Sequence, residues 1–327
     1  METIGSLSKK KFAVYGLGLS GSSVVKFLKK LKALSICTWD DNKKININSN
    51  SFSKALEKVD YIVVSPGINI KKSKFKKILA KNKKKIITDL DLFYMANADI
   101  KSAAITGTNG KSTACKLLEQ VLKKANIDVQ LGGNIGKPIL DLKIRNKSFV
   151  VIEASSFQLA YSKFIKPNYA VILNIADDHL DWHGTKKNYI NSKLKIFRNQ
   201  DKNDFALVNN KKNISLFKKN NFLSELISVK QNIPSGIKNR YLLSKPNKEN
   251  LTFVYSISKI LNIKKIVFLN AVNKFKGLPH RHEIFYKKKG ITFINNSKAT
   301  SFDATKHALK SNKNIFWIVG GLNKLGD

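Results

Sequence analysis

Nine consecutive residues decide the fold class of this chain: Ile105-Thr106-Gly107-Thr108-Asn109-Gly110-Lys111-Ser112-Thr113. The apolar run before the glycines predicts a strand over 102–106, and the residues after them predict a helix ending near Ala125. In a glycine-rich turn between a strand and a helix, backbone N–H groups surround phosphate oxygens. We expect Lys111 to neutralise the β- and γ-phosphates of a nucleotide, and Ser112 or Thr113 to hold Mg²⁺. A plain strand-to-helix turn is the alternative, which Gly-Lys-Ser-Thr at the helix start disfavours.

A second glycine-rich turn, Gly16-Leu17-Gly18-Leu19-Ser20-Gly21, lies nearer the N-terminus. It follows a predicted strand over 11–15 and precedes a predicted helix over 22–32, and Asp40 ends the next strand. Taken alone, this pattern indicates dinucleotide binding and a nicotinamide-dependent oxidoreductase. A sugar nucleotide would suit the turn equally well, because the turn only brings backbone close to a diphosphate. The alternation of strands and helices predicts an α/β fold with parallel sheets.

Candidate metal ligands follow two further predicted strands, over 149–153 and 169–174. Glu153 ends the first strand, and Asp177-Asp178-His179 follows the second. Functional groups gather at the carboxyl ends of parallel strands, and Mg²⁺ prefers oxygen ligands such as Glu153. His179 is equally compatible with a hydrogen-bonding role in its loop, and we expect His183 to be structural or on the surface. Lys193 lies in a lysine-rich predicted helix over 186–198, where a solvated face is the default interpretation.

The remaining third of the chain carries fewer signals. Residues 209–247 are rich in Lys, Asn and Ser and are predicted to be irregular, before a helix over 250–261. Beyond Leu278 we expect strands over 283–286, 291–295 and 315–319 and a helix near 302–310.

The composition limits the possible partners. The formal net charge of the 327 residues is +38, but nearly all of the positive charge is lysine rather than arginine, and the lysines are spread along the whole chain. Because A/T-rich codons explain the excess of Lys, Asn and Ile, we disfavour a dedicated nucleic-acid-binding module. The N-terminus has no signal-peptide pattern, no stretch approaches ~20 uncharged apolar residues, and Cys37 and Cys115 match no metal spacing. We expect a cytoplasmic protein without a membrane span.

Ten segments, taken together, resemble the Mur ligase family, and within it the members that add D-glutamate. The match runs from Lys11 to Asp327. The segments are GLGLSGSS (16–23), VVSPGI (63–68), ITGTNGKST (105–113), GGNIG (132–136), EASSFQL (153–159), DDHLDWHG (177–184), SKLKIF (192–197), GLPHR (277–281), NNSKAT (295–300) and GG-x-x-K (320–324).

The resemblance implies three domains. Residues 1–93 would form a Rossmann-like domain for the UDP-substrate, 94–278 a central P-loop-like ATPase domain, and 279–327 an incomplete Rossmann-like ligase domain. The first glycine-rich turn would then hold a UDP-sugar diphosphate rather than a nicotinamide cofactor. The positions that match the family's UDP-substrate contacts are Gly18, Leu19, Ser20, Asp40, Gly67 and Asn134.

The chemistry implied by the resemblance is a two-step ligation with ATP and two Mg²⁺ ions. The alanyl carboxylate of UDP-N-acetylmuramoyl-L-alanine attacks the γ-phosphorus, and D-glutamate then attacks the acyl phosphate. Lys111, His179 and Lys193 match catalytic positions, with Lys193 at the position that the family carbamylates. The metal positions match Ser112, Glu153, His179 and Lys193; the ATP positions match the loop 107–113 together with Asn250 and Arg281; the D-glutamate side matches Lys298, Thr300 and Lys324.

The chain departs from the family pattern at several points. Asn296 stands where an aspartate is common, and family members continue for roughly a hundred residues beyond the GG-x-x-K turn, so we expect a fragment or a truncated gene product. We expect a monomer whose partners are its small-molecule substrates. The alternatives left open are another amino-acid ligase of this family, a folylpolyglutamate synthase-like enzyme, and the oxidoreductase that Gly16–Gly21 alone would suggest.

Overall fold

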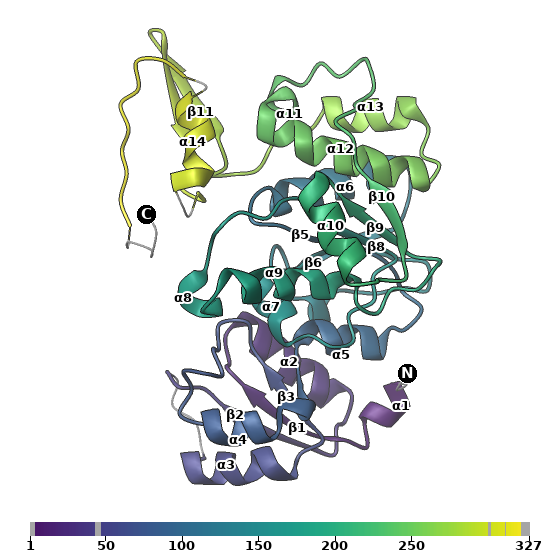
Figure 1. Cartoon of the computed structure of the whole chain (residues 1–327), viewed down its shortest axis with the longest axis vertical. Helices are drawn as coiled ribbons and strands as arrows, with labels where there is room; N and C mark the ends of the chain where they lie inside the picture. The colour runs from purple at the N-terminus through teal and green to yellow at the C-terminus, as the bar shows by residue number, and fades with distance from the viewer. Residues whose placement is uncertain (1–3, 43–46, 300–301, 311, 322–327) are drawn as a thin grey trace.

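The computed structural model describes residues 4–42, 47–299, 302–310 and 312–321, and within them the chain is α/β as predicted. Its strands form two parallel sheets and one antiparallel hairpin; the two parallel sheets lie one above the other along the long axis of the molecule (Figure 1). None of the helices described combines the length and the apolar character that crossing a membrane requires.

The first sheet has the strand order β2-β1-β3-β4, and every pairing is parallel. Gly18 caps α2, so the helix begins within the glycine-rich segment, three residues before the predicted start. The elements of this part are α1 (Ile4–Leu7), β1 (Lys11–Tyr15), α2 (Leu19–Lys30), β2 (Ser35–Trp39), α3 (Ser49–Lys58), β3 (Tyr61–Val64), α4 (Lys76–Lys81), η1 (Lys83–Lys85) and β4 (Ile86–Ile87).

The second sheet is also parallel, in the order β10-β9-β8-β5-β7-β6. Its strands are β5 (Lys101–Thr106), β6 (Val129–Gly133), β7 (Phe149–Glu153), β8 (Tyr169–Ile172), β9 (Phe205–Val208) and β10 (Glu225–Ser228). The chain order reverses at β5, which pairs with β7 on one side and β8 on the other. Ligands of open α/β sheets bind in the crevice at such a reversal.

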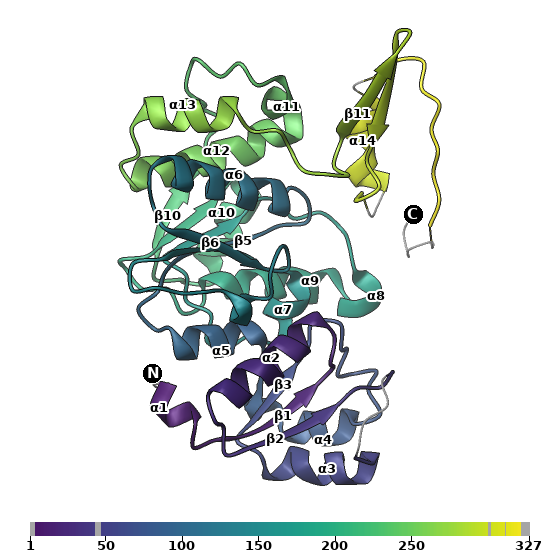
Figure 2. The same ribbon diagram turned by 180° about the vertical axis from the view of Figure 1, so that it is seen from behind.

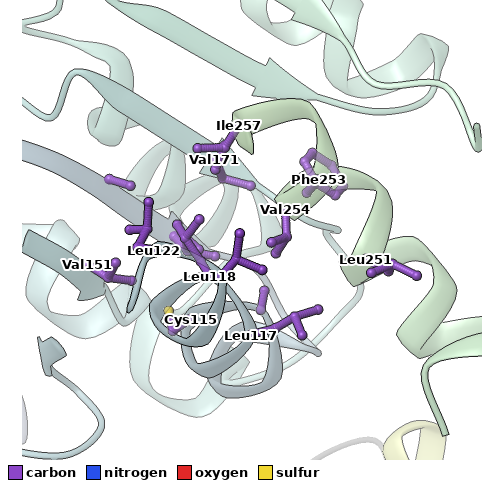
Figure 3. Packing of buried hydrophobic residues seen from close by; sticks show 14 of the residues in the cluster. Cys115, Leu117, Leu118, Leu122, Val151, Val171, Leu251, Phe253, Val254 and Ile257 are labelled. Atoms are coloured by element: carbon purple, nitrogen blue, oxygen red, sulfur yellow. The ribbon is translucent and has the colours of Figure 1, made fainter. Parts of the chain in front are cut away.

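Helices cover both faces of the second sheet. On one face, leucines of α6 pack against apolar side chains of α12, including Leu251 and Val254 (Figure 3). The helices on this side are α6 (Lys111–Lys124), α11 (Arg240–Leu243), α12 (Lys245–Ile260) and α13 (Lys265–Asn273). The apolar side chains of the other face pack with α5 (Asp89–Ala96), η2 (Ile139–Asp141), α7 (Ser156–Tyr161), α9 (Lys186–Leu194), η3 (Lys195–Phe197) and α10 (Lys211–Lys219).

Helix α5 packs against both sheets, and all eight of its residues are buried. Phe93 and Tyr94 belong to the apolar cluster of the second sheet, whereas Leu92 and Met95 belong to that of the first. The helix begins with a capping box, in which Thr88 and Asp91 satisfy each other's backbone N–H groups. Seen from behind, α5 lies at the level where the two parts of the molecule meet (Figure 2).

Two sequence predictions are wrong. Residues 209–247 are not irregular, because they contain α10, β10 and α11. Their asparagines are helix caps rather than loop formers: Asn210 accepts from the backbone of α10, and Asn239 from that of α11. Residues 315–319 form no strand; they pair with no strand in the described chain, and Phe316 and Ile318 are 98% exposed.

The last described part lies to one side of the second sheet (Figure 1). As predicted, it contains two strands, β11 (Glu283–Lys288) and β12 (Ile291–Asn295), and the helix α14 (Phe302–Lys310). The strands form an antiparallel hairpin. A short helix of the second part, α8 (Leu180–His183), follows β8 and points toward this side in the same view.

Candidate active site

The loop after β5 has the shape of a phosphate-binding turn. Gly110 has a φ of 86° and directly precedes the first residue of α6, Lys111. A Cβ at Gly110 would collide with the buried side chain of Asn250, so the sequence needs glycine there. Ser112 and Thr113 lie in the first turn of α6, where free N–H groups and the helix dipole favour an anion. The structure therefore brings Asn250 and the predicted loop together.

Two residues that sequence reasoning missed hold this loop in place. The backbone N–H of Asn109 donates to Oδ1 of Asn174 at 2.9 Å, and Nδ2 of Asn174 donates to the Asn109 carbonyl at 3.1 Å. The hydroxyls of Thr108 and Tyr189 lie 2.9 Å apart and share a hydrogen bond. Asn174 closes a predicted strand, and this position was its only signal in the sequence. These bonds fix the loop to the segment after β8 and to α9.

The amines of Lys111 and Lys193 meet at a single backbone oxygen. Lys111 Nζ donates to the Gly107 carbonyl at 2.7 Å and to the Thr108 carbonyl at 2.8 Å, and Lys193 Nζ donates to the Gly107 carbonyl at 2.8 Å. Lys193 is 1% exposed, so the solvated-face interpretation of this residue is wrong. Burial, and then the charge of Lys111, hold the pKa of Lys193 well below its usual range. Burial also lowers the pKa of Lys111, which Glu153 partly offsets.

Glu153 has one oxygen in use and one free. Its Oε1 accepts from Asn134 Nδ2 at 2.6 Å, while Oε2 is buried and has no hydrogen-bond partner among the described residues. A buried carboxylate oxygen without a partner is costly unless a cation or a donor approaches it. The carboxylate and the Ser112 hydroxyl are the oxygen ligands that Mg²⁺ prefers. In the described chain, no three His, Cys, Asp or Glu side chains gather into a group able to hold a metal.

His179 is positioned by its neighbours at the carboxyl end of β8. It adopts the left-handed conformation with φ 54°, its ring lies 4.7 Å from the ring of Phe157, and its Nε2 is 3.3 Å from Asp178 Oδ2. His183 is buried, with Nε2 3.1 Å from the Ser156 hydroxyl, and burial lowers its pKa to about 4. The position of His183 fits the structural role expected for it.

Arg281 joins the last part of the chain to the phosphate loop, since its Nη2 donates to Ser112 Oγ at 3.0 Å. Close by, the Lys298 N–H donates to the His280 carbonyl at 3.1 Å, and Asn296 Oδ1 accepts from the His282 N–H at 3.0 Å. Thr300 and Lys324, the other residues expected on the D-glutamate side, lie outside the described residues.

The first glycine-rich turn lies open at the edge of the first sheet. Gly18 and Gly67 have no atom near the position of a Cβ, and Leu19 beside Ser20 is 86% exposed. Asp40 is hydrogen-bonded to the turn, because its Oδ2 accepts from the Leu17 N–H at 2.6 Å. The predicted UDP-contact residues of the turn and Asp40 are therefore neighbours.

Comparisons with known proteins agree with this geometry. A family model described as the Mur ligase middle domain matches residues 105–273. Two relatives named UDP-N-acetylmuramoylalanine--D-glutamate ligase are similar along nearly the whole chain. The one from Rickettsia bellii is 32% identical over 97% of this chain and 78% of its own, and the one from Aquifex aeolicus is 34% identical with the same coverage.

Solved structures support the fold. The UDP-N-acetylmuramate:L-alanyl-gamma-D-glutamyl-meso-diaminopimelate ligase from Neisseria meningitides superposes with a TM-score of 0.56 at 15% identity, covering 83% of this chain and 99% of that one. The UDP-N-acetylmuramate-alanine ligase from Thermotoga maritima gives 0.55 at 18% identity, covering 92% and 77%. Both matches support the same fold for this chain.

Proposed function

This chain belongs to the Mur ligase family, and from that premise we propose that it joins D-glutamate to UDP-N-acetylmuramoyl-L-alanine. It is an ATP-dependent ligase that forms an amide bond in peptidoglycan precursor synthesis. One observation carries the proposal: the phosphate loop follows β5 at the reversal point of the sheet. Glu153 ends the neighbouring strand on one side, and His179 follows the strand on the other.

The reaction has two steps. An oxygen of the alanyl carboxylate attacks the γ-phosphorus of ATP, and the bond to the leaving ADP oxygen breaks. The amine of D-glutamate then attacks the carbonyl carbon of the acyl phosphate, and a tetrahedral intermediate expels phosphate. Negative charge grows on oxygen in both steps, so a fixed cation in the loop lowers the barrier.

The loop supplies that cation through Lys111. Its amine donates to two carbonyls of the loop, and we expect it to donate instead to phosphate oxygens when a nucleotide binds there. Mg²⁺ would be held by the Ser112 hydroxyl and the free oxygen of Glu153, and when bound it offsets the charge of the phosphates. Asn250 and Arg281 would contact the nucleotide, since both already touch the loop or its first helical turn.

Lys193 would act as a carbamate. Burial, and then the charge of Lys111, lower the pKa of its amine and so favour the neutral form, which has the lone pair that attacks CO₂. The N–C bond forms as one C–O π bond of CO₂ breaks, a proton leaves the nitrogen, and the neutral amine becomes a negatively charged carbamate. This change would add a second oxygen ligand beside Glu153 and would place a negative charge next to the cation of Lys111.

The substrate would lie along the edge of both sheets. We assign the UDP end to Gly18, Leu19, Ser20, Asp40 and Gly67, and the rest of the substrate to Asn134 and His179. D-glutamate would approach from the side of Lys298, Thr300 and Lys324.

The proposed domains are 1–93, 94–278 and 279–327. We also propose that the enzyme is cytoplasmic and monomeric.

The test is phosphate release from ATP by the purified chain. We expect release only when UDP-N-acetylmuramoyl-L-alanine and D-glutamate are both present. Turnover with L-lysine, D-alanine or L-glutamate, and none with D-glutamate, would refute this assignment within the family. Thermal stabilisation by NADH and not by UDP would instead favour the oxidoreductase interpretation of the first turn.

A further inference from the structure

A cavity lies between the first and second sheets, and none of the residues assigned above to the nucleotide, the UDP-substrate or D-glutamate lines it. Its volume is about 300 Å³, at the lower end of the range for small-molecule sites. One side is formed by the loop after β3 and by η1, and the other by the end of α7, by α8, and by α9 with η3. The lining residues are Asn69, Ile70, Lys71, Lys83, Ile86, Ala160, Tyr161, Lys163, Trp182, His183, Asn188, Asn191, Ser192 and Lys195.

The charge of this cavity is entirely positive. Lys71, Lys83, Lys163 and Lys195 line it, and no aspartate or glutamate does. None of the four ammonium groups belongs to an ion pair within the described residues. Lys163 Nζ donates to the carbonyls of Lys83 and Lys84 at 2.9 and 2.6 Å, and Lys195 Nζ donates to the Ala160 carbonyl. Carbonyl oxygens carry no full negative charge. Burial lowers the pKa of both amines, that of Lys195 to about 8, and the charge of Asp91 partly offsets this lowering.

The walls add flat rings and neutral donors. The rings of Tyr161 and Trp182 lie 5.5 Å apart, and the indole Nε1 of Trp182 is buried without a hydrogen-bond partner among the described residues. The amides of Asn188 and Asn191 also line the cavity. A group rich in acceptor oxygens would satisfy the ammonium and amide donors at once.

The two walls are already joined around the cavity. Asn69 Nδ2 donates to the Trp182 carbonyl at 2.9 Å, and the Ile70 N–H donates to the Tyr161 hydroxyl at 3.1 Å. A ligand in this position would therefore contact both parts of the molecule at their junction. It would also contact Ser192, the residue before Lys193 in α9.

We propose that this cavity binds a small phosphate-bearing anion, which joins the two walls and is separate from the nucleotide and UDP sites. A doubly charged phosphate has acceptor oxygens for the donors of the cavity, and its negative charge complements the four lysines. The site needs neither glycine-rich turn, and the proposal does not depend on the ligase assignment.

The chain offers a matched pair of variants for the test, Lys83→Ala and Lys84→Ala. Both residues are exposed lysines of the same short helix, and the two substitutions remove the same charge, but only Lys83 lines the cavity. The probe is inorganic pyrophosphate, titrated by calorimetry with ADP and UDP at saturation, so that neither glycine-rich turn is free. Lys71→Ala is a second lining variant, and Lys111→Ala a control for the nucleotide loop.

We expect one pyrophosphate to bind, with the dissociation constant raised about tenfold by Lys83→Ala and by Lys71→Ala, because each substitution removes a charge-assisted contact. Lys84→Ala and Lys111→Ala should match the unmodified chain. If Lys83→Ala and Lys84→Ala weaken pyrophosphate binding equally, the anion is attracted by the overall positive charge of the protein and not by this cavity, and the proposal is overturned. No binding to the unmodified chain, or full binding to Lys83→Ala, would overturn it as well. Citrate in place of pyrophosphate tests the class: equal affinity would contradict the preference for phosphate.

Discussion

Asp89 at the start of α5 offers a sharp test of the packing between the two sheets. Its carboxylate is buried; both oxygens accept from Nε2 of Gln158, at 3.2 and 3.1 Å, and the backbone N–H groups of Leu90 and of Asp89 itself also donate to it. Burial above all raises its pKa from 3.8 to about 6. Asp89→Asn keeps the shape and an acceptor for Gln158 but removes the charge. We therefore expect this substitution to stabilise the protein at neutral pH.

The size of the effect follows from linkage. A carboxyl whose pKa is raised on folding favours the folded state at low pH, and this contribution is lost as pH rises toward and through about 6. At pH 8 the ionised Asp89 costs about 3 kcal/mol relative to a neutral group, and at pH 5 about 1.5 kcal/mol. Any pH-independent effect of the asparagine cancels in the comparison. The gain from Asp89→Asn should thus grow by about 1.5 kcal/mol between pH 5 and pH 8.

Urea unfolding followed by circular dichroism measures this difference in free energy at each pH. Asp91→Asn is the matched control, two residues along the same helix. Asp91 Oδ1 accepts from Ser162 Oγ and from the N–H groups of Lys163 and Phe164, so an amide there would face donors. We expect Asp91→Asn to destabilise by about 2–4 kcal/mol. Parallel pH curves for the unmodified chain and Asp89→Asn would refute the assigned burial cost.

Three further outcomes are expected. Lys193→Ala should lose ligase turnover and regain part of it with added acetate or formate, whereas full activity without them would exclude the carbamate. Asn174→Leu should weaken ATP binding about ten- to hundredfold in calorimetry, because it leaves the N–H and carbonyl of Asn109 unpaired; Asn174→Asp, which keeps the acceptor, should fall in between. Gly21→Ala should lower the free energy of unfolding by about 3 kcal/mol or more, since its Cβ would collide with the Gly16 carbonyl, while Gly18→Ala should not.

The sequence predicts the parallel sheets well, because buried strands next to glycine-rich turns are a local pattern. β1 and β7 begin and end at the predicted residues. The prediction fails where composition misleads: the Lys- and Asn-rich region 209–247 has helices whose caps are its asparagines. It also fails at 315–319, where an apolar run has the composition of a strand but no neighbour in the described chain to pair with.

The candidate site is likewise only partly predictable from the sequence. The phosphate loop is predictable, because a short motif carries its chemistry. Asn174 and Tyr189 are not, since their partners are about 65 and 81 positions away and only the sheet order brings them to the loop. Lys193 needs the family resemblance as well, because its helix has the composition of a solvated one and its burial depends on packing.

The burial of α5 also has a consequence for motion. Since all eight residues of the helix are covered, the first and second sheets could separate only by exposing apolar side chains on two surfaces at once. The chain between α13 and β11 carries no such helix, and its link to the phosphate loop includes the Arg281–Ser112 hydrogen bond. We therefore expect opening and closing of the enzyme to occur by rotation about residues 274–282, with the two parallel sheets moving as one rigid body.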